Sequence, residues 1–313
     1  MIKYFNIDPD QGVSKGSDQE FNWLAIDQDS PQEVEKILQE YSLPQDIFVG
    51  ADSAGEVSRV EHLKNTKLKN PLSVVVLNLA DKDQTIEKRI EPISFVLSDD
   101  LLLTYTGKNS PFIDNLLDQH GAALNSFEKV LATSLLSIYN HFIAGLKALK
   151  KEIDALDQAA RKTTESKELF RLADVDRAVI FIDHTLTDQN DMLEKLWNDE
   201  KLLEKIDDEA LIYDVQLRQK QAQKLVEVYH ELIDTIGALF GSMIDSNLNH
   251  LMKYLESAAL ILTIPTVTAG IWGMNTGGLP WEKSDWGFWI VMTATVILTI
   301  LTAIHLVNKN YFK

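Results

Sequence analysis

The side chains that could bind a ligand in this sequence are mostly oxygen donors. The 313 residues include no cysteine, which excludes disulfides and thiolate metal sites, and the seven histidines show no ligand spacing. A bound metal would therefore be held by carboxylate or amide oxygens, the ligands of hard cations such as Mg²⁺. One amide stands in an unusual setting: Asn275 ends the tripeptide Gly273-Met274-Asn275, directly after a long apolar stretch.

The net charge limits the possible partners. A formal charge of -17 would be repelled by phosphates, so we expect no nucleic-acid partner. The charge suits a protein that attracts cations, although an acidic surface also simply aids solubility. The sequence has no glycine-rich phosphate loop and no Ser/His/Asp arrangement that we can identify, and we therefore expect no enzyme.

Two apolar stretches near the C-terminus are long enough to cross a bilayer. The second, Trp286–Val307, is uniformly apolar and begins with interfacial tryptophans, so we expect it to be the outer, lipid-facing helix. The first, Leu255–Met274, is interrupted by polar and small residues, as in helices that pack on other helices or line water. These residues are Thr263, Pro265, Thr266, Thr268, Gly270 and Gly273, and Pro265 is either a tolerated kink or part of a gate.

The distribution of lysines predicts the orientation. Lys253 precedes the first stretch, and Lys309 and Lys313 follow the second, whereas the loop at residues 275–285 has one lysine. Positive charge favours the cytoplasmic side, so we expect both termini in the cytoplasm and the loop outside. The N-terminus lacks the apolar region of a signal peptide, which agrees with a multi-pass protein of the inner (plasma) membrane.

Residues 1–122 alternate strand-like and helix-like segments and predict an α/β domain. A capping box with proline at the first helical position predicts a helix over residues 31–41, and Ser110-Pro111 predicts a short helix to Asp118. We expect Asp99 and Asp100 in a turn between strands. The predicted strands are residues 1–7, 21–27 and 72–80, with two or three more in residues 85–107.

Residues 123–209 are predicted to be helical, with helices over 126–161 and 168–197 and a connector over 198–209. One helix then runs over 210–274, roughly 100 Å at 1.5 Å per residue. Its apolar residues alternate steps of three and four, which predicts a heptad seam that needs a partner: Ala222, Val226, Tyr229, Ile233, Ile236, Phe240 and Met243. The helix is either a stalk or a lever that connects the α/β domain to a pore.

The tripeptide, its place at the end of the first apolar stretch and the long helix before it resemble the CorA family of divalent-cation channels. Two spans alone cannot enclose a pore, so a channel would require an oligomer in the bilayer. The resemblance implies that this oligomer is a homopentamer, a number that the sequence itself does not give. It implies an α/β cytoplasmic domain, a long-helix stalk and two C-terminal transmembrane helices. The corresponding boundaries are 1–122 for the α/β domain, 123–209 for a helical region, 210–274 for the stalk and first span, 275–285 for an extracellular loop, 286–307 for the second span and 308–313 for a basic cytoplasmic tail.

The resemblance also implies the pore. Asn275, repeated by symmetry, would present amide oxygens to a hydrated Mg²⁺, which releases its water reluctantly. Gly273 would allow close helix approach, and Met274 would pack between helices. Glu282 and Asp285 would concentrate cations at the mouth, or are simply solvated. Counting back from the tripeptide implies the pore-lining residues Asn249, Met252, Leu255, Thr263 and Thr266, with Glu256 on the same face.

Members of this family close when cytoplasmic Mg²⁺ bridges acidic residues of neighbouring subunits. The same count places Asp214 at a regulatory position, or it is plain surface. Its partner is not determined, and Asp99 and Asp100 are candidates. The resemblance thus implies that Mg²⁺ is both the transported and the regulatory ion, with Co²⁺, Ni²⁺ or Zn²⁺ as rival cargo. A different class, a membrane-tethered coiled-coil adaptor, is disfavoured by the polar residues of the first span.

Overall fold

The structure is a computed structural model that describes residues 2–28, 31–48, 56–80, 85–108, 110–274, 277–281 and 284–308. The chain divides into two compact units. We call the first, Met1–Gln158 with Lys167–Thr235, the sheet unit, and the second, Ala159–Ser166 with Ile236–Lys313, the C-terminal unit. The domain boundaries predicted from the sequence stay predictions.

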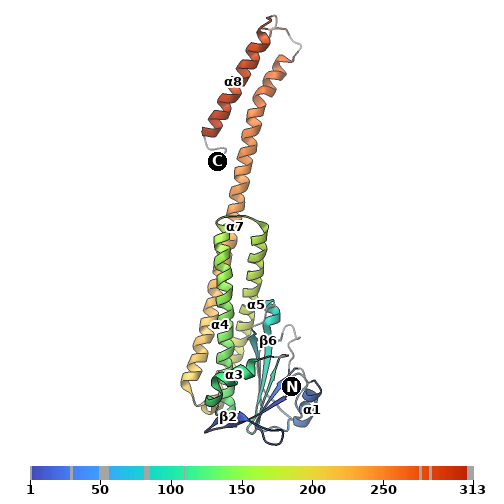
Figure 1. Cartoon of the computed structure of the whole chain (residues 1–313), viewed down its shortest axis with the longest axis vertical. Helices are drawn as coiled ribbons and strands as arrows, with labels where there is room; N and C mark the ends of the chain where they lie inside the picture. The colour runs from blue at the N-terminus through green and yellow to red at the C-terminus, as the bar shows by residue number, and fades with distance from the viewer. Residues whose placement is uncertain are drawn as a thin grey trace. The chain divides into compact units, whose positions relative to one another are not determined.

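The sheet unit contains a seven-stranded mixed sheet, which lies at one end of the long helices α4 (Phe127–Ala160) and α5 (Ser166–Trp197) (Figure 1). Among the described strand pairs, β3 and β7 are parallel and the others are antiparallel. The strand order is β2-β1-β3-β7-β6-β5-β4. The strands are β1 (Ile2–Asp8), β2 (Gly12–Lys15), β3 (Trp23–Asp27), β4 (Arg59–His62), β5 (Leu72–Leu79), β6 (Ile90–Leu97) and β7 (Leu102–Thr106).

Both faces of this sheet are covered. Helix α1 (Pro31–Tyr41) packs on one face through a cluster that includes Ile26, Ile37 and Leu103. On the other face, the Trp23 indole donates a hydrogen bond to the Thr104 hydroxyl over 3.1 Å, and both side chains are fully buried. Strand β5 is buried along its whole length, which explains its run of valines.

The two long helices, α4 and α5, contact strand β5. A Cβ at Gly145 would collide with the Leu79 side chain, so glycine allows α4 to approach the strand closely. Strand β4 pairs with β5 only up to Val75, which leaves the backbone N–H of Leu77 without a strand partner on that side. That N–H donates instead to the buried side-chain oxygen of Gln189 in α5, over 3.1 Å.

The other helices among the described residues are α2 (Ile86–Arg89), α3 (Phe112–His120), α6 (Glu200–Ile206), α7 (Glu209–Trp272) and α8 (Gly287–Asn308), and Gly121–Ala123 form a 3₁₀ turn. Helix α7 has 64 residues and continues through Pro265. The α/β class and the long C-terminal helices therefore agree with the sequence prediction, and α1 spans the predicted residues.

The structure differs from the local predictions at several places. Strand β4 and the β1–β2 hairpin were not predicted. The turn of this hairpin is closed by the Asp8 carboxylate, which accepts from two backbone N–H groups, and by Gly12 at φ 74°. Residues 86–89, predicted as strand, form the short helix α2. Helix α3 begins at Phe112 without a side-chain cap, so Ser110 does not cap it.

The predicted seam of α7 does not need another subunit along most of its length. Ala222, Val226, Tyr229 and Ile233 are at most 5% exposed within the single chain, and they belong to the sheet unit. Met243 alone among the seam residues is only half-buried. The heptad pattern therefore reports packing within the chain, and the expectation of a partner for it was wrong.

Candidate pore and regulatory site

Helix α8 and the last part of α7 are the two described helices that are long and apolar enough to cross a membrane. In each helix, only 6% of the most apolar stretch of 18 residues is buried in the single chain. The core helix of a soluble protein would be mostly covered by its own chain. The two helices therefore present apolar surface that the chain leaves uncovered, as expected for spans in lipid.

One stripe of α7 is shielded in this region. The buried and half-buried positions from residue 257 onward are Ser257, Ala258, Ile261, Ile264, Pro265 and Thr268, and those of α8 are Gly287, Val291, Thr295, Thr299, Thr302, Ala303 and Leu306. Because both helices belong to one compact unit and each has one shielded stripe, we take the two stripes to face each other. Helix α8 thus covers one side of α7.

The predicted pore-lining residues lie on the opposite side of α7. At about 100° per residue, their mean direction is roughly 180° from the centre of the shielded stripe. All six are exposed in the single chain: Asn249, Met252, Leu255, Glu256, Thr263 and Thr266. The side of α7 away from α8 is therefore free to face a second copy or water.

The threonines of the two spans are alike. The Thr263 and Thr266 hydroxyls each donate to the backbone carbonyl four residues earlier, over 2.7 and 2.8 Å. Thr295, Thr299 and Thr302 of α8 do the same. Since each hydroxyl is satisfied by its own helix, threonine content does not mark the first span as water-lined. The distinctive features of the first span are its proline, its glycines and its end.

Helix α7 ends directly before the tripeptide. The N–H groups of Gly273 and Met274 donate to Ala269 and Ile271 over 2.8 and 3.3 Å, so both residues continue the last helical turn. A Cβ at Gly273 would lie 3.0 Å from the Ala269 carbonyl oxygen, which favours glycine there. Met274 and Asp285 are exposed. Asn275 and Glu282, predicted at the mouth and in the loop, lie outside the described residues.

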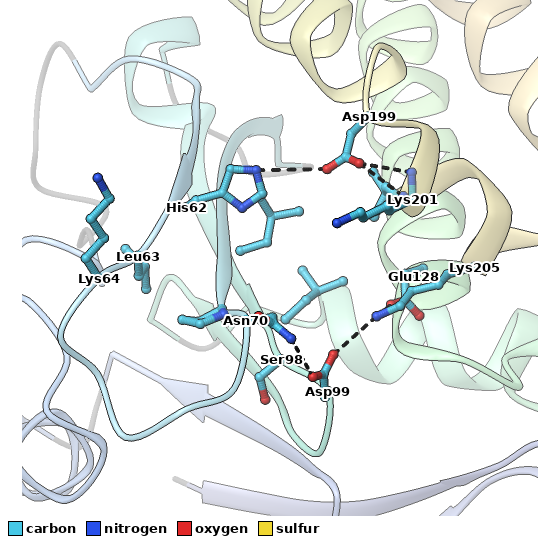
Figure 2. Close-up of a pocket in the computed structure, with 14 residues that line it drawn as sticks. His62, Leu63, Lys64, Asn70, Ser98, Asp99, Glu128, Asp199, Lys201 and Lys205 are labelled. Atoms are coloured by element: carbon cyan, nitrogen blue, oxygen red, sulfur yellow. Dashed lines mark hydrogen bonds and ion pairs between the residues drawn. The ribbon is translucent and has the colours of Figure 1, made fainter.

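The two acidic candidates of the α/β domain lie in the turn between β6 and β7, as predicted, and each is paired within its own chain. Asp99 accepts from the Asn70 amide over 2.8 Å and lies 3.5 Å from the Lys205 ammonium (Figure 2). Asp100 pairs with Lys69 over 2.7 Å. The Asn70 hydrogen bond lowers the pKa of Asp99; partial desolvation opposes this shift, and Lys205 adds to it.

Figure 2 shows how α6 contributes to this arrangement. Lys205 also pairs with Glu128 at the start of α4, over 3.3 Å, beside a cavity of about 490 Å³. No local sequence pattern points to this lysine, because 106 residues separate it from Asp99. Asp99 and Asp100 are therefore each already paired with a lysine of their own chain.

Asp214 differs from Asp99 and Asp100. It is exposed on the second turn of α7, and the described part of the chain offers it no hydrogen bond or ion pair. Within the described residues no group of three or more acidic or histidine side chains could hold a metal. A metal at Asp214 would therefore need ligands from elsewhere, such as a second subunit.

An α/β unit, a long helix whose last part is apolar and uncovered, and a second uncovered apolar helix together define a class of membrane protein. The family model of CorA-like Mg²⁺ transporter proteins matches residues 18–308, so the chain belongs to this family. Its members are transporters.

Similar proteins cover most of the chain. A magnesium transport protein CorA of Helicobacter pylori is 23% identical over 92% of this chain and 90% of its own length. The cobalt/magnesium transport protein CorA of Thermotoga maritima is 22% identical over 76% of this chain and 69% of its own. The complete structure of the CorA magnesium transporter from Methanocaldococcus jannaschii matches with a TM-score of 0.78 over 97% of this chain and 96% of that chain, at 17% identity, which supports the same fold.

Proposed function

We propose that this protein is the subunit of a homopentameric Mg²⁺ channel in the inner membrane, with both termini in the cytoplasm. One observation carries the proposal: the side of α7 opposite α8 is exposed, bears the six predicted pore residues and ends at Gly273-Met274. Five copies would turn this side toward a common axis and leave α8 as the outer ring. Lipid would then contact α8.

Transport in this proposal is passive. The free energy of a divalent cation falls by about 4.6 kcal/mol when it enters across a membrane potential of about 100 mV, inside negative, so no chemical energy source is needed. Asn275 would hold the hydrated ion through amide oxygens. A ring of carboxylates would bind the ion more tightly and release it more slowly, which would limit flux.

Regulation would act at the subunit boundary. Asp214, exposed and unpaired among the described residues, would share a Mg²⁺ ion with a neighbouring subunit. Bound Mg²⁺ would reverse the repulsion between carboxylates and hold the ring closed, with Met252 and Leu255 packed around the axis. Loss of the ion would restore the repulsion and loosen the ring.

The direct test is cation flux into liposomes that contain the purified protein. We expect Mg²⁺ entry that increases with an inside-negative potential and requires no nucleotide. A protein that inserts and assembles but carries no divalent cation would overturn the proposal. Mass measurement in mild detergent tests the assembly, because a strictly monomeric protein cannot enclose a pore.

Co²⁺ is the second candidate cargo, because the Thermotoga maritima relative carries cobalt in its name. The same liposomes should therefore be tested with Mg²⁺, Co²⁺, Ni²⁺ and Zn²⁺ in parallel. We expect the highest flux for Mg²⁺, since a ring of neutral amides suits an ion that keeps its water. Faster entry of Co²⁺ under equal gradients would reassign the cargo and leave the channel architecture unchanged.

A further inference from the structure

The turn between α4 and α5 makes a specific contact with the predicted pore helix. The turn, Ala159–Ser166, belongs to the C-terminal unit with the last part of α7, apart from most of the two helices that it joins. Within that unit the Asn247 amide of α7 donates a hydrogen bond to the Thr164 hydroxyl over 3.2 Å. This hydrogen bond connects the turn to α7 at one defined position.

Asn247 lies just before the predicted constriction. It precedes Met252 by five residues and Leu255 by eight, or about 8 and 12 Å along the helix. Helix α7 is continuous through this segment. A rotation of α7 at Asn247 would therefore reach the constriction almost unchanged.

The rotational position of Asn247 is equally informative. At about 100° per residue, Asn247 points roughly 40° from the stripe shielded by α8 and roughly 140° from the centre of the predicted pore face. The turn consequently contacts the outer side of α7. A contact on this side can hold the helix without obstructing the axis.

We propose that Thr164 and Asn247 are positioning residues that fix the rotation of α7 so that Asn249 and Met252 face the pore axis. The reason rotation matters is Lys253, the exposed residue that follows Met252. A rotation of about 100° would turn Lys253 to the axis in place of Met252, and a ring of lysines would repel a divalent cation. This inference rests on the proposed channel function.

The contact itself can be tested without any transport measurement. The sequence has no cysteine, so the double variant Thr164→Cys/Asn247→Cys has only these two thiols. We expect a short bifunctional thiol reagent to link them within one chain in the membrane-embedded protein. The control pair Thr164→Cys/Asn249→Cys places the second thiol on the predicted pore face and should not link within one chain. Absence of the first link, or equal linking of both pairs, would overturn the inference.

The functional role of the contact between Thr164 and Asn247 is tested by removing the hydrogen bond. Asn247→Ala and Thr164→Val should each change the half-inhibiting internal Mg²⁺ concentration by about two- to tenfold, the range that one hydrogen bond can supply. Because both residues act through the same bond, the double variant should change it no further. Thr164→Ser keeps the hydroxyl and should behave like the parent protein.

Gln219→Ala provides the matched control. It removes a 2.7 Å amide hydrogen bond from α7 to Asn190 of α5, within the sheet unit and 28 residues before Asn247. If general loosening of α7 caused the effect, this variant would shift inhibition at least as much, and the positioning role would be wrong. A parent protein without Mg²⁺ flux would defeat the channel proposal, and the cross-linking result would still decide the contact.

Discussion

The two parts of α7 bury their apolar residues in different ways. In the sheet unit, Val226 and Ile233 are covered by their own chain, whereas Leu251 and Leu255 beyond it are more than half exposed. The first part is a packed element of a folded subunit. The apolar side chains of the second part are left uncovered in a single chain, because lipid and other copies of the protein must cover them. The contrast separates what stabilises the subunit from what forms a pore.

The largest expected effect lies at the far end of the uncovered part. Asn275→Ala should abolish Mg²⁺ flux in liposomes, because the ring of amide oxygens at the mouth would be lost. The protein should still insert and assemble, since the substitution removes no apolar surface. Asn308→Ala, at the end of α8, is the matched control and should keep parental flux. Parental flux in Asn275→Ala would remove Asn275 from the mouth.

Next in size is a stability difference between the two parts of α7. Ile233→Ala leaves a cavity in a covered position and should destabilise the subunit by about 2–5 kcal/mol. Leu251→Ala alters an uncovered position and should reduce the free energy of unfolding of the isolated subunit by less than about 0.5 kcal/mol. Thermal unfolding in detergent, followed by circular dichroism, measures both. A loss at Leu251 that matches the loss at Ile233 would mean that another subunit covers Leu251.

Regulation by Mg²⁺ should depend on Asp214 and appear as a change in protease sensitivity. In the parent protein, EDTA should increase cleavage near residues 198–209, because unbridged carboxylates repel at the subunit boundary. Asp214→Lys supplies a fixed positive charge that can pair with a neighbouring carboxylate without metal. Cleavage of this variant should therefore be equal with and without Mg²⁺.

Asp99→Lys is the matched control for that experiment. Asp99 is already paired with Lys205 in its own chain, so this variant should keep the parental response to EDTA. If Asp214→Lys also responds like the parent protein, Asp214 is ordinary surface and the regulatory ion binds elsewhere.

The smallest effect concerns the start of α7. The Asp208 carboxylate accepts from the Leu211 backbone N–H over 3.0 Å and pairs with Lys129 over 3.4 Å. The backbone hydrogen bond is the main cause of its lowered pKa, with Lys129 contributing; partial desolvation opposes the shift. A lowered pKa in the folded state gives stability that is present above the ordinary pKa of 3.8 and is lost as pH falls through the lower folded value.

Asp208→Ala should therefore reduce the free energy of unfolding by about 0.5–2 kcal/mol at pH 7, and this reduction relative to the parent protein should become smaller below pH 4. Asp208→Asn keeps the capping oxygen without the charge, so its free energy of unfolding should fall by less. Thermal unfolding at pH 7 and pH 3 measures this. A difference that does not depend on pH would mean that the charge of Asp208 contributes nothing.

Much of this architecture followed from local sequence patterns. Capping residues and proline predicted α1 to the residue, the valine run predicted β5, and the length of the apolar stretches predicted the two spans. These features depend on near neighbours in the chain or on composition, so one sequence is enough to predict them. The tripeptide at the end of α7 likewise needs no tertiary information, and its resemblance agrees with the family match.

Other features depended on contacts between residues far apart in the sequence. Periodicity shows which residues of α7 share a face, but it cannot show what covers that face, and the seam from Ala222 to Ile233 is covered by its own chain. The pairing of Asp99 with Lys205 and the contact of Thr164 with Asn247 join residues 106 and 83 positions apart. Only the tertiary structure brings such residues together, because local patterns carry no information about which distant side chains will meet.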